Sequence, residues 1–283
     1  MLDPKRAGHT GITWPGPGGS VAQAVEETGA TGFAAFETMA HQFLSDPGSV
    51  RALREASEQT GVRIAAAYCN ARYIEPDQAE ADIAKVVGWG KTLKELGGDL
   101  VVIGPGGKRP GGYAPADYRF MAQTLNEIGR QLTDIGVTIA LHPHTGTSVE
   151  TRAETEQVLE AIDPRYGGFG PDVGQMQKAG DDPVDIVRTY RQLVRHVHIK
   201  DYAGGPVQRD AEGKYIDPTG YAGYVPLGQG VVELKSILQI LSEDNYAGWL
   251  MVELDGTPRA PHVPRDAAAM NKAHLDRLVA EVG

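Results

Sequence analysis

The sequence has little cysteine, no basic excess and no long apolar run, and each shortage excludes a class of protein. Cys69 is the single cysteine, so no intramolecular disulfide can form, as is typical of a reducing compartment. The 27 basic residues are outnumbered by 37 acidic ones, and the net charge of −10 argues against nucleic acid as a main partner. No stretch approaches the roughly 20 apolar residues that cross a bilayer, and no signal-peptide run follows residues 1–6. The sequence therefore predicts a soluble cytoplasmic protein that binds neither nucleic acid nor membrane.

Two nucleotide-binding motifs are also missing. The first predicted strand-to-helix turn, residues 13–20, contains glycines and prolines but not the G-x-G-x-x-G order of a dinucleotide site. Residues 104–108, Gly-Pro-Gly-Gly-Lys, lack the spacing of a phosphate loop. We interpret the first segment as a turn and the second as the loop after the fourth strand.

What the sequence does contain is a regular alternation of short apolar runs and longer amphipathic segments, which is typical of βα units. No linker interrupts it over 283 residues. It predicts an α/β fold, a single-domain (β/α)8 TIM barrel over residues 1–283, with an open doubly wound sheet as the rival. The predicted strands are His9–Thr13, Gly32–Phe36, Arg63–Tyr68, Leu100–Ile103, Val137–Leu141, Gly168–Pro171, Arg195–Ile199 and Trp249–Val252.

Three segments carry clear helix or loop signals. A stripe of apolar residues between Leu125 and Ile135 has helical spacing, and Gly136 is placed to end that helix. Thr151 with Glu154 fits a capping box at a helix start. Residues 201–230 are polar and rich in Gly, Tyr and Pro, which predicts a long rim loop or lid.

Polar residues follow four consecutive predicted strands. His142 and His144 end the fifth strand, Asp172 follows the sixth, His198 lies in the seventh, and Glu253 ends the eighth. In a barrel these strand ends meet at the active-site face, so the four positions predict a metal site. Taken singly, each has a plainer interpretation: a histidine bonded within the fold, an aspartate that caps a turn, a solvated glutamate. Their coincidence favours a shared ion, because buried carboxylates are costly unless paired or metal-bound.

Imidazole with carboxylate ligands favours a transition metal over an oxygen-only ion. We expect Mn or Co, with Zn, Fe and then Mg as alternatives. Side chains alternate along a strand, so His142 and His144 share one wall and either could be the ligand.

Further rim residues have two interpretations each. Glu37 reaches either the pocket or the surface, and Lys200 binds either an oxyanion or its neighbour Asp201. Trp14 and Tyr68 either wall the pocket against a sugar-like ring or pack at the rim. Cys69 has no thiolate-activating context, so we interpret it as structural.

These motifs resemble the xylose-isomerase-like barrel superfamily of sugar isomerases and epimerases, over most of the chain. Within it they are most similar to the inosose dehydratases, because of the His-x-His-x-Gly-Thr segment. The segments that carry the resemblance are Ala140-Leu-His-Pro-His-Thr-Gly-Thr147, Pro171-Asp-Val-Gly174, His196-Val-His-Ile-Lys-Asp201 and Gly248-Trp-Leu-Met-Val-Glu253.

The resemblance implies a ligand set of His142, Asp172, His198 and Glu253. Two departures matter. Many epimerases have a glutamate where this chain has His142, and Gln175 stands where the family pattern has a substrate-contacting histidine. Gln175 can bond a substrate but cannot shuttle protons at neutral pH.

The function implied is a metal-dependent lyase that dehydrates an inosose-like cyclic ketone through an enolate. His144 is predicted to transfer a proton, with Lys200 and Glu253 as further catalytic residues and a polyol or sugar-derived ketone as partner. Two alternatives remain open: an isomerase, epimerase or keto-glycoside eliminase at the same site, and a non-catalytic sugar-binding barrel. Superfamily members often form dimers or tetramers, so a homo-oligomer is the implied assembly.

Overall fold

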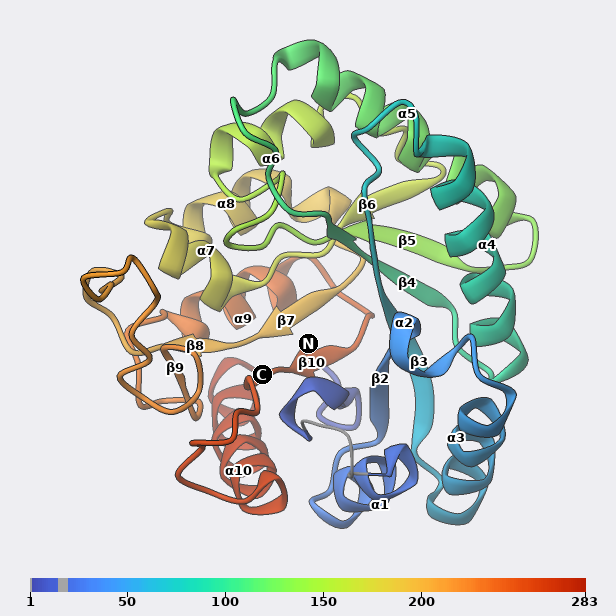
Figure 1. Cartoon of the computed structure of the whole chain (residues 1–283). Helices are drawn as coiled ribbons and strands as arrows, with labels where there is room; N and C mark the ends of the chain where they lie inside the picture. The colour runs from blue at the N-terminus through green and yellow to red at the C-terminus, as the bar shows by residue number, and fades with distance from the viewer. Residues whose placement is uncertain (1, 15–19) are drawn as a thin grey trace.

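Eight parallel strands curl into a barrel that is ringed by helices in the computed structural model, which describes residues 2–14 and 20–283 (Figure 1). Residues 15–19 of the predicted first turn lie outside this description. The barrel strands are β1 Ala7–Thr10, β2 Ala35–Met39, β3 Arg63–Ala71, β4 Leu100–Pro105, β5 Thr138–Leu141, β6 Gly167–Phe169, β7 Val197–Ile199 and β10 Leu250–Val252.

The barrel closes between β6 and β7, the two ends of the strand order β6-β5-β4-β3-β2-β1-β10-β7. Two parallel bridges join them, Phe169 with Val194 and Asp172 with His198. At the second bridge the His198 N–H donates to the Pro171 carbonyl at 2.8 Å. The predicted (β/α)8 barrel is thereby confirmed over the doubly wound alternative. The same seam places two predicted metal ligands side by side.

The helices follow the barrel strands as predicted. Thr151 and Glu154 form the capping box of α6, with the Glu154 carboxylate accepting from the Thr151 N–H at 2.8 Å. Nowhere in the described chain is a helix both long and apolar enough to span a bilayer. The helices are α1 Val21–Ala30, α2 Ala40–Phe43, α3 Pro47–Thr60, α4 Ala79–Glu95, α5 Pro115–Thr133, α6 Arg152–Leu159, α7 Val173–Ala179, α8 Pro183–Tyr190, α9 Leu234–Glu243 and α10 Pro264–Val282, with 3-10 turns at Gly11–Thr13 and Arg191–Leu193.

Several predicted strand boundaries were wrong, and the first two strands show why. The first strand ends at Thr10, because residues 11–13 turn into a 3-10 helix. The second does not include Gly32, whose φ of 88° belongs to the preceding turn, and it runs on to Met39. Glu37 therefore lies inside β2 instead of following it.

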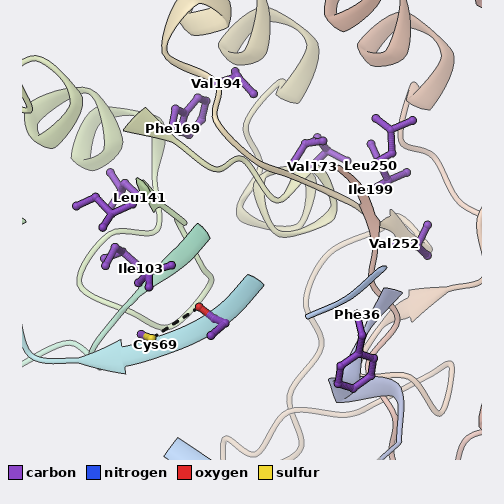
Figure 2. Close-up of a cluster of buried hydrophobic side chains, with 14 of the residues drawn as sticks. Phe36, Cys69, Ile103, Leu141, Phe169, Val173, Val194, Ile199, Leu250 and Val252 are labelled. Carbon is purple, nitrogen blue, oxygen red and sulfur yellow. Dashed lines mark hydrogen bonds between the residues drawn. The ribbon is translucent and has the colours of Figure 1, made fainter. Parts of the chain in front are cut away.

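The alternation of side chains along each strand separates two apolar regions. Along each strand, every second side chain points outward to the helices. Figure 2 shows this for Ile103, Leu141 and Phe169, which belong to one large cluster. Intervening residues such as Val102 and Ala140 belong to a separate small cluster and face the barrel interior. Since Leu141 points outward, the next residue, His142, points inward.

The predicted rim segment, residues 201–230, contains a small antiparallel pair, β8 (Asp201–Tyr202) and β9 (Tyr224–Val225). Between these strands the chain extends away from the barrel (Figure 1). The buried Asp201 carboxylate fastens the base of the segment, accepting backbone N–H groups from residues 202, 228, 230 and 232 at 2.9–3.1 Å. That this segment acts as a lid stays a prediction.

Candidate functional site

Three of the four predicted ligands meet inside the closing seam of the barrel. His142 Nε2 and His198 Nδ1 each lie 3.9 Å from Asp172 Oδ2, and their ligand atoms all fall within 4.8 Å of one another. All three side chains are at most 1% exposed. Asp172 also caps α7, because its Oδ1 accepts from the Gly174 and Gln175 N–H groups at 2.9 Å. One carboxylate oxygen of Asp172, Oδ1, therefore caps the helix, and the other, Oδ2, faces the two histidines.

The fourth predicted ligand, Glu253, borders this group and is held by Lys200. Its Oε2 lies 3.0 Å from His198 Nδ1, without the alignment of a hydrogen bond, and its Oε1 accepts from Lys200 Nζ at 2.6 Å. It lies outside the set whose ligand atoms are all within 4.8 Å. The structure therefore places Glu253 beside the three converging residues, with only one oxygen free of the lysine.

Lys200 is fully buried among carboxylates. Besides Glu253, its Nζ lies 2.5 Å from Asp255 and 3.7 Å from Asp172, and it sits 3.9 Å from the centroid of the Tyr224 ring. Burial opposes the charged form, but these three carboxylates outweigh it and hold the pKa of Lys200 well above its ordinary value. The alternative pairing of Lys200 with Asp201 is wrong, since Asp201 is used by backbone N–H groups.

The pKa values of the two histidines in the converging group are shifted in opposite directions. Burial, followed by the neighbouring His198, holds the pKa of His142 well below its ordinary value, so this imidazole is neutral. Burial also opposes a charge on His198, but Glu37 and Glu253 outweigh it and raise the pKa of that ring. For Asp172, burial raises the carboxyl pKa although Lys200 opposes the shift. The site therefore combines a neutral imidazole, His142, with a second imidazole, His198, whose charged form the neighbouring carboxylates favour.

Glu37 lies in the barrel interior, in contact with two histidines, and not at the surface. It is 1% exposed, and its Oε2 is 2.8 Å from His196 Nε2 and 3.1 Å from His198 Nε2. Burial opposes ionisation, but the charges and hydrogen bonds of the two histidines lower the pKa of Glu37. The prediction that Glu37 contacts substrate finds no support in this position.

His144 is on the same wall as His142 but outside the converging group, with their ring centroids 6.2 Å apart. Its Nδ1 donates to the Thr145 carbonyl at 2.8 Å, and its Nε2 accepts from the Gln175 amide at 2.8 Å. The Thr145 hydroxyl donates to Gln175 Oε1 at 2.6 Å, which turns the amide N–H toward the ring. Gln175 thus positions His144, and the proton-accepting atom of His144 is Nε2.

The two predicted aromatic walls differ in location. The Tyr68 ring meets the edge of His142 with centroids 5.6 Å apart, so it borders the site. Trp14 is half-buried against His9, and its Nε1 donates to Glu27 Oε2 at 2.7 Å. Trp14 is therefore anchored to α1. Cys69 is buried, and burial raises its thiol pKa, in agreement with a structural role.

Two residues of the site escaped the sequence prediction. Asp255 stands two positions after Glu253 and shares its wall, so the alternation of side chains was a usable signal. Tyr224 comes from the rim segment, and no pattern in that segment pointed to the barrel. Its buried hydroxyl has no hydrogen-bond partner among residues 2–14 and 20–283.

The converging group fits a divalent transition metal. Asp172 Oδ2 and His198 Nδ1 are buried atoms that find no hydrogen-bond partner in the described chain, although such atoms are nearly always satisfied. Two imidazoles and a carboxylate are the donor set that such ions prefer. A cation at this point would satisfy both atoms and offset the surrounding carboxylates. His142, Asp172 and His198 are the residues that could hold it.

Comparisons with known proteins agree with this architecture. An inosose dehydratase from Clostridium botulinum (strain Alaska E43 / Type E3) is 25% identical over 250 residues, covering 83% of this chain and 82% of that protein. The probable 3-DHS dehydratase AsbF from Bacillus anthracis superposes with a TM-score of 0.74 at 17% identity, over 95% of this chain and 98% of that one. The IOLI protein, solved with a bound zinc atom, gives 0.75 at 18%, over 98% and 99%.

The inosose dehydratases among the relatives, together with the family match, confirm the prediction of an enzyme in the dehydratase or isomerase and epimerase group. Residues 22–274 match the family described as the xylose isomerase-like TIM barrel, which is most of the chain. The predicted resemblance is therefore confirmed, and this chain belongs to the xylose isomerase-like TIM barrel family.

Proposed function

We propose that this chain is a divalent-metal-dependent dehydratase of a polyhydroxylated cyclic ketone of the inosose type. The observation that carries the proposal is the convergence of His142, Asp172 and His198, with unsatisfied buried atoms, beside the charged Lys200. The inosose dehydratases among its relatives support the substrate class. The metal is Mn or Co by preference, and the zinc of the IOLI structure makes Zn the first alternative.

His142, Asp172 and His198 hold the ion in this proposal, and Glu253 Oε2 stands close enough to His198 to complete the set. When bound, the metal supplies Lewis-acid polarisation of the ketone oxygen and stabilises the enolate charge. Asp172 and Glu253 would then each face the ion as well as Lys200. The arrangement avoids the cost of uncompensated buried charge.

The proton transfers fall to His144 and Lys200. His144 Nε2 accepts the proton from the carbon beside the ketone, once the substrate displaces the Gln175 amide from that nitrogen. The electron pair of the C–H bond becomes the new carbon–carbon double bond, and the β carbon–oxygen bond breaks. Lys200 Nζ gives a proton to the departing hydroxide, so water leaves. Solvent returns the proton from His144 to Lys200.

The carboxylate arrangement favours elimination over a two-glutamate epimerisation. Such an epimerisation needs one carboxylate on each face of the substrate carbon, and His142 occupies the position of the first. Glu253 is tied to Lys200 through Oε1 at 2.6 Å. A single lysine-bound carboxylate together with an imidazole is better suited to removing one proton and releasing a hydroxyl.

Incubation of the Mn- or Co-loaded protein with an inosose tests the proposal. We expect loss of one water per turnover, followed by ultraviolet absorption of the enone or dione and by mass spectrometry. His144→Gln and Lys200→Met are expected to lose at least a hundredfold in kcat, whereas the exposed His262→Gln keeps wild-type activity. A product of unchanged mass with solvent deuterium at the carbon beside the ketone would replace dehydration by epimerisation. No turnover with Mn, Co, Zn or Fe would reject the substrate class.

A further inference from the structure

Glu37, His196 and His198 form a second buried cluster directly below the converging group, and His198 belongs to both. Glu37 Oε2 lies 2.8 Å from one Nε2 and 3.1 Å from the other. The exposed fractions of the three side chains are 0–1%. Glu37 lies in β2, His196 directly precedes β7 and His198 is the middle residue of β7, so the barrel itself fixes their spacing.

The chemistry of the contacts determines where the protons are. One oxygen of Glu37, Oε2, lies within hydrogen-bond distance of two ring nitrogens, and a carboxylate offers only acceptors, so both histidines donate their Nε2–H to it. With Nε2–H used in this way, His198 presents Nδ1 as its ligand atom, and Nδ1 is the atom that faces Asp172 at 3.9 Å. The Nε2 atom of His198 therefore belongs to the cluster with Glu37, and its Nδ1 atom belongs to the converging group.

The two clusters differ in what they lack. In the lower one, a single oxygen accepts two N–H groups at ordinary hydrogen-bond lengths, so it needs nothing further. In the upper one, Asp172 Oδ2 and His198 Nδ1 have no donor from any described residue. A cation would break two good hydrogen bonds in the lower cluster but would satisfy unpaired atoms in the upper one. The geometry does not make the lower cluster a second metal site.

We propose that Glu37 is a positioning residue that fixes the proton of His198 on Nε2 and thereby directs the metal to Nδ1. His196 anchors the carboxylate by occupying the same oxygen from the other side. This inference rests on the proposed metal site. Metal-bound histidines commonly donate their second ring nitrogen to a carboxylate, and loss of that partner weakens metal affinity about 10- to 100-fold.

The first test measures zinc and cobalt affinity of the full-length protein by competition with a chelator. Glu37→Gln is expected to bind 10- to 100-fold more weakly, while the surface change Glu127→Gln, which alters net charge equally, leaves affinity unchanged. Long-range 1H–15N NMR of the zinc-loaded wild type is expected to show His198 protonated at Nε2 and bound through Nδ1. Equal affinity of Glu37→Gln, or coordination through Nε2 in the wild type, would overturn the inference.

A second pair of variants leaves Glu37 in place. His196→Gln keeps an N–H donor for the carboxylate, so it is expected to retain metal affinity within about twofold; His196→Leu removes the donor and is expected to bind more weakly. If both variants bind equally, His196 does not anchor Glu37 and the proposal fails. Absence of zinc and cobalt binding in the wild type itself would instead reject the proposed function, so the two failures are distinguishable.

Discussion

The Asp201 carboxylate offers a sharp test of how the rim segment is attached to the barrel. It accepts four backbone N–H groups, from Tyr202 at 2.9 Å, Val232 at 3.1 Å, and Gly228 and Gly230 at 2.9 Å. In Asp201→Asn an amide NH2 replaces one oxygen, so two backbone N–H groups then face a donor. Hydrogen bonds to a charged group contribute about 1.5–3 kcal/mol each, so we expect the free energy of unfolding to fall by about 3–5 kcal/mol.

The effect should reach the active site, because the segment that Asp201 fastens carries Tyr224. The Tyr224 ring covers Lys200 at 3.9 Å, so loosening the base of the segment uncovers the lysine. We expect Asp201→Asn to lower kcat/KM and to speed proteolytic cleavage within residues 203–223. Urea unfolding at pH 7, steady-state kinetics and limited proteolysis measure the three effects.

The matched control is Asp210→Asn in the same segment. Asp210 is exposed, and within the described part of the chain its carboxylate accepts only from the Glu212 and Lys214 N–H groups, at 3.1 and 2.8 Å. Water can replace these bonds, so the expected loss is below about 1 kcal/mol. If Asp201→Asn is no less stable than Asp210→Asn, the reasoning that buried backbone donors depend on this carboxylate is refuted.

Three further predictions concern the site and its pH dependence. Gly174→Ala would place a Cβ 2.8 Å from Lys200 Cγ, so kcat should fall at least tenfold, whereas Gly88→Ala, with open space around it, should leave kcat unchanged. Tyr224→Phe removes a buried hydroxyl that has no partner within the described residues, so Tm should hold or rise while kcat/KM drops; a parallel loss of Tm would indicate a packing role. Burial lowers the pKa of His9 to about 4 in the folded protein. Between pH 6.5 and pH 4 the unfolded chain therefore binds a proton at His9 that the folded chain does not, so the free energy of unfolding decreases as the pH is lowered. Urea unfolding should show that the loss of stability from pH 8 to pH 5 is about 2 kcal/mol smaller in His9→Gln than in the wild type.

The positions of residues in or directly after predicted strands were sufficient to find the converging group. His142, Asp172 and His198 are each preceded by a buried run, and parallel strands in a closed barrel bring such ends together. Strand alternation fixed their inward direction as well, because outward-facing neighbours such as Leu141 pack against the helices. For these residues the local pattern and the barrel rule carry all the information.

The misplacement of Glu37 shows where local patterns stop. Its strand was shifted because the apolar run Phe33–Phe36 includes turn residues, and a shift of register changes which contacts a side chain can make. Nothing near Glu37 in sequence indicates His196 or His198, which lie 159 and 161 residues away. Only the closed barrel brings β2 and β7 to opposite sides of one interior.

The βα rhythm, the inward-facing histidines and the carboxylate at the end of the last barrel strand can all be inferred from the amino-acid sequence, because periodicity and strand ends are local properties. The ion pairs and hydrogen bonds among these groups depend on the folded barrel. In the folded barrel Glu253 is bonded to Lys200, Gln175 to His144, and Glu37 to two histidines. The Tyr224 ring lies over the lysine and comes from a segment without a regular pattern. Such pairings depend on distances of about 3 Å between segments remote in sequence, and only the packed barrel sets those distances.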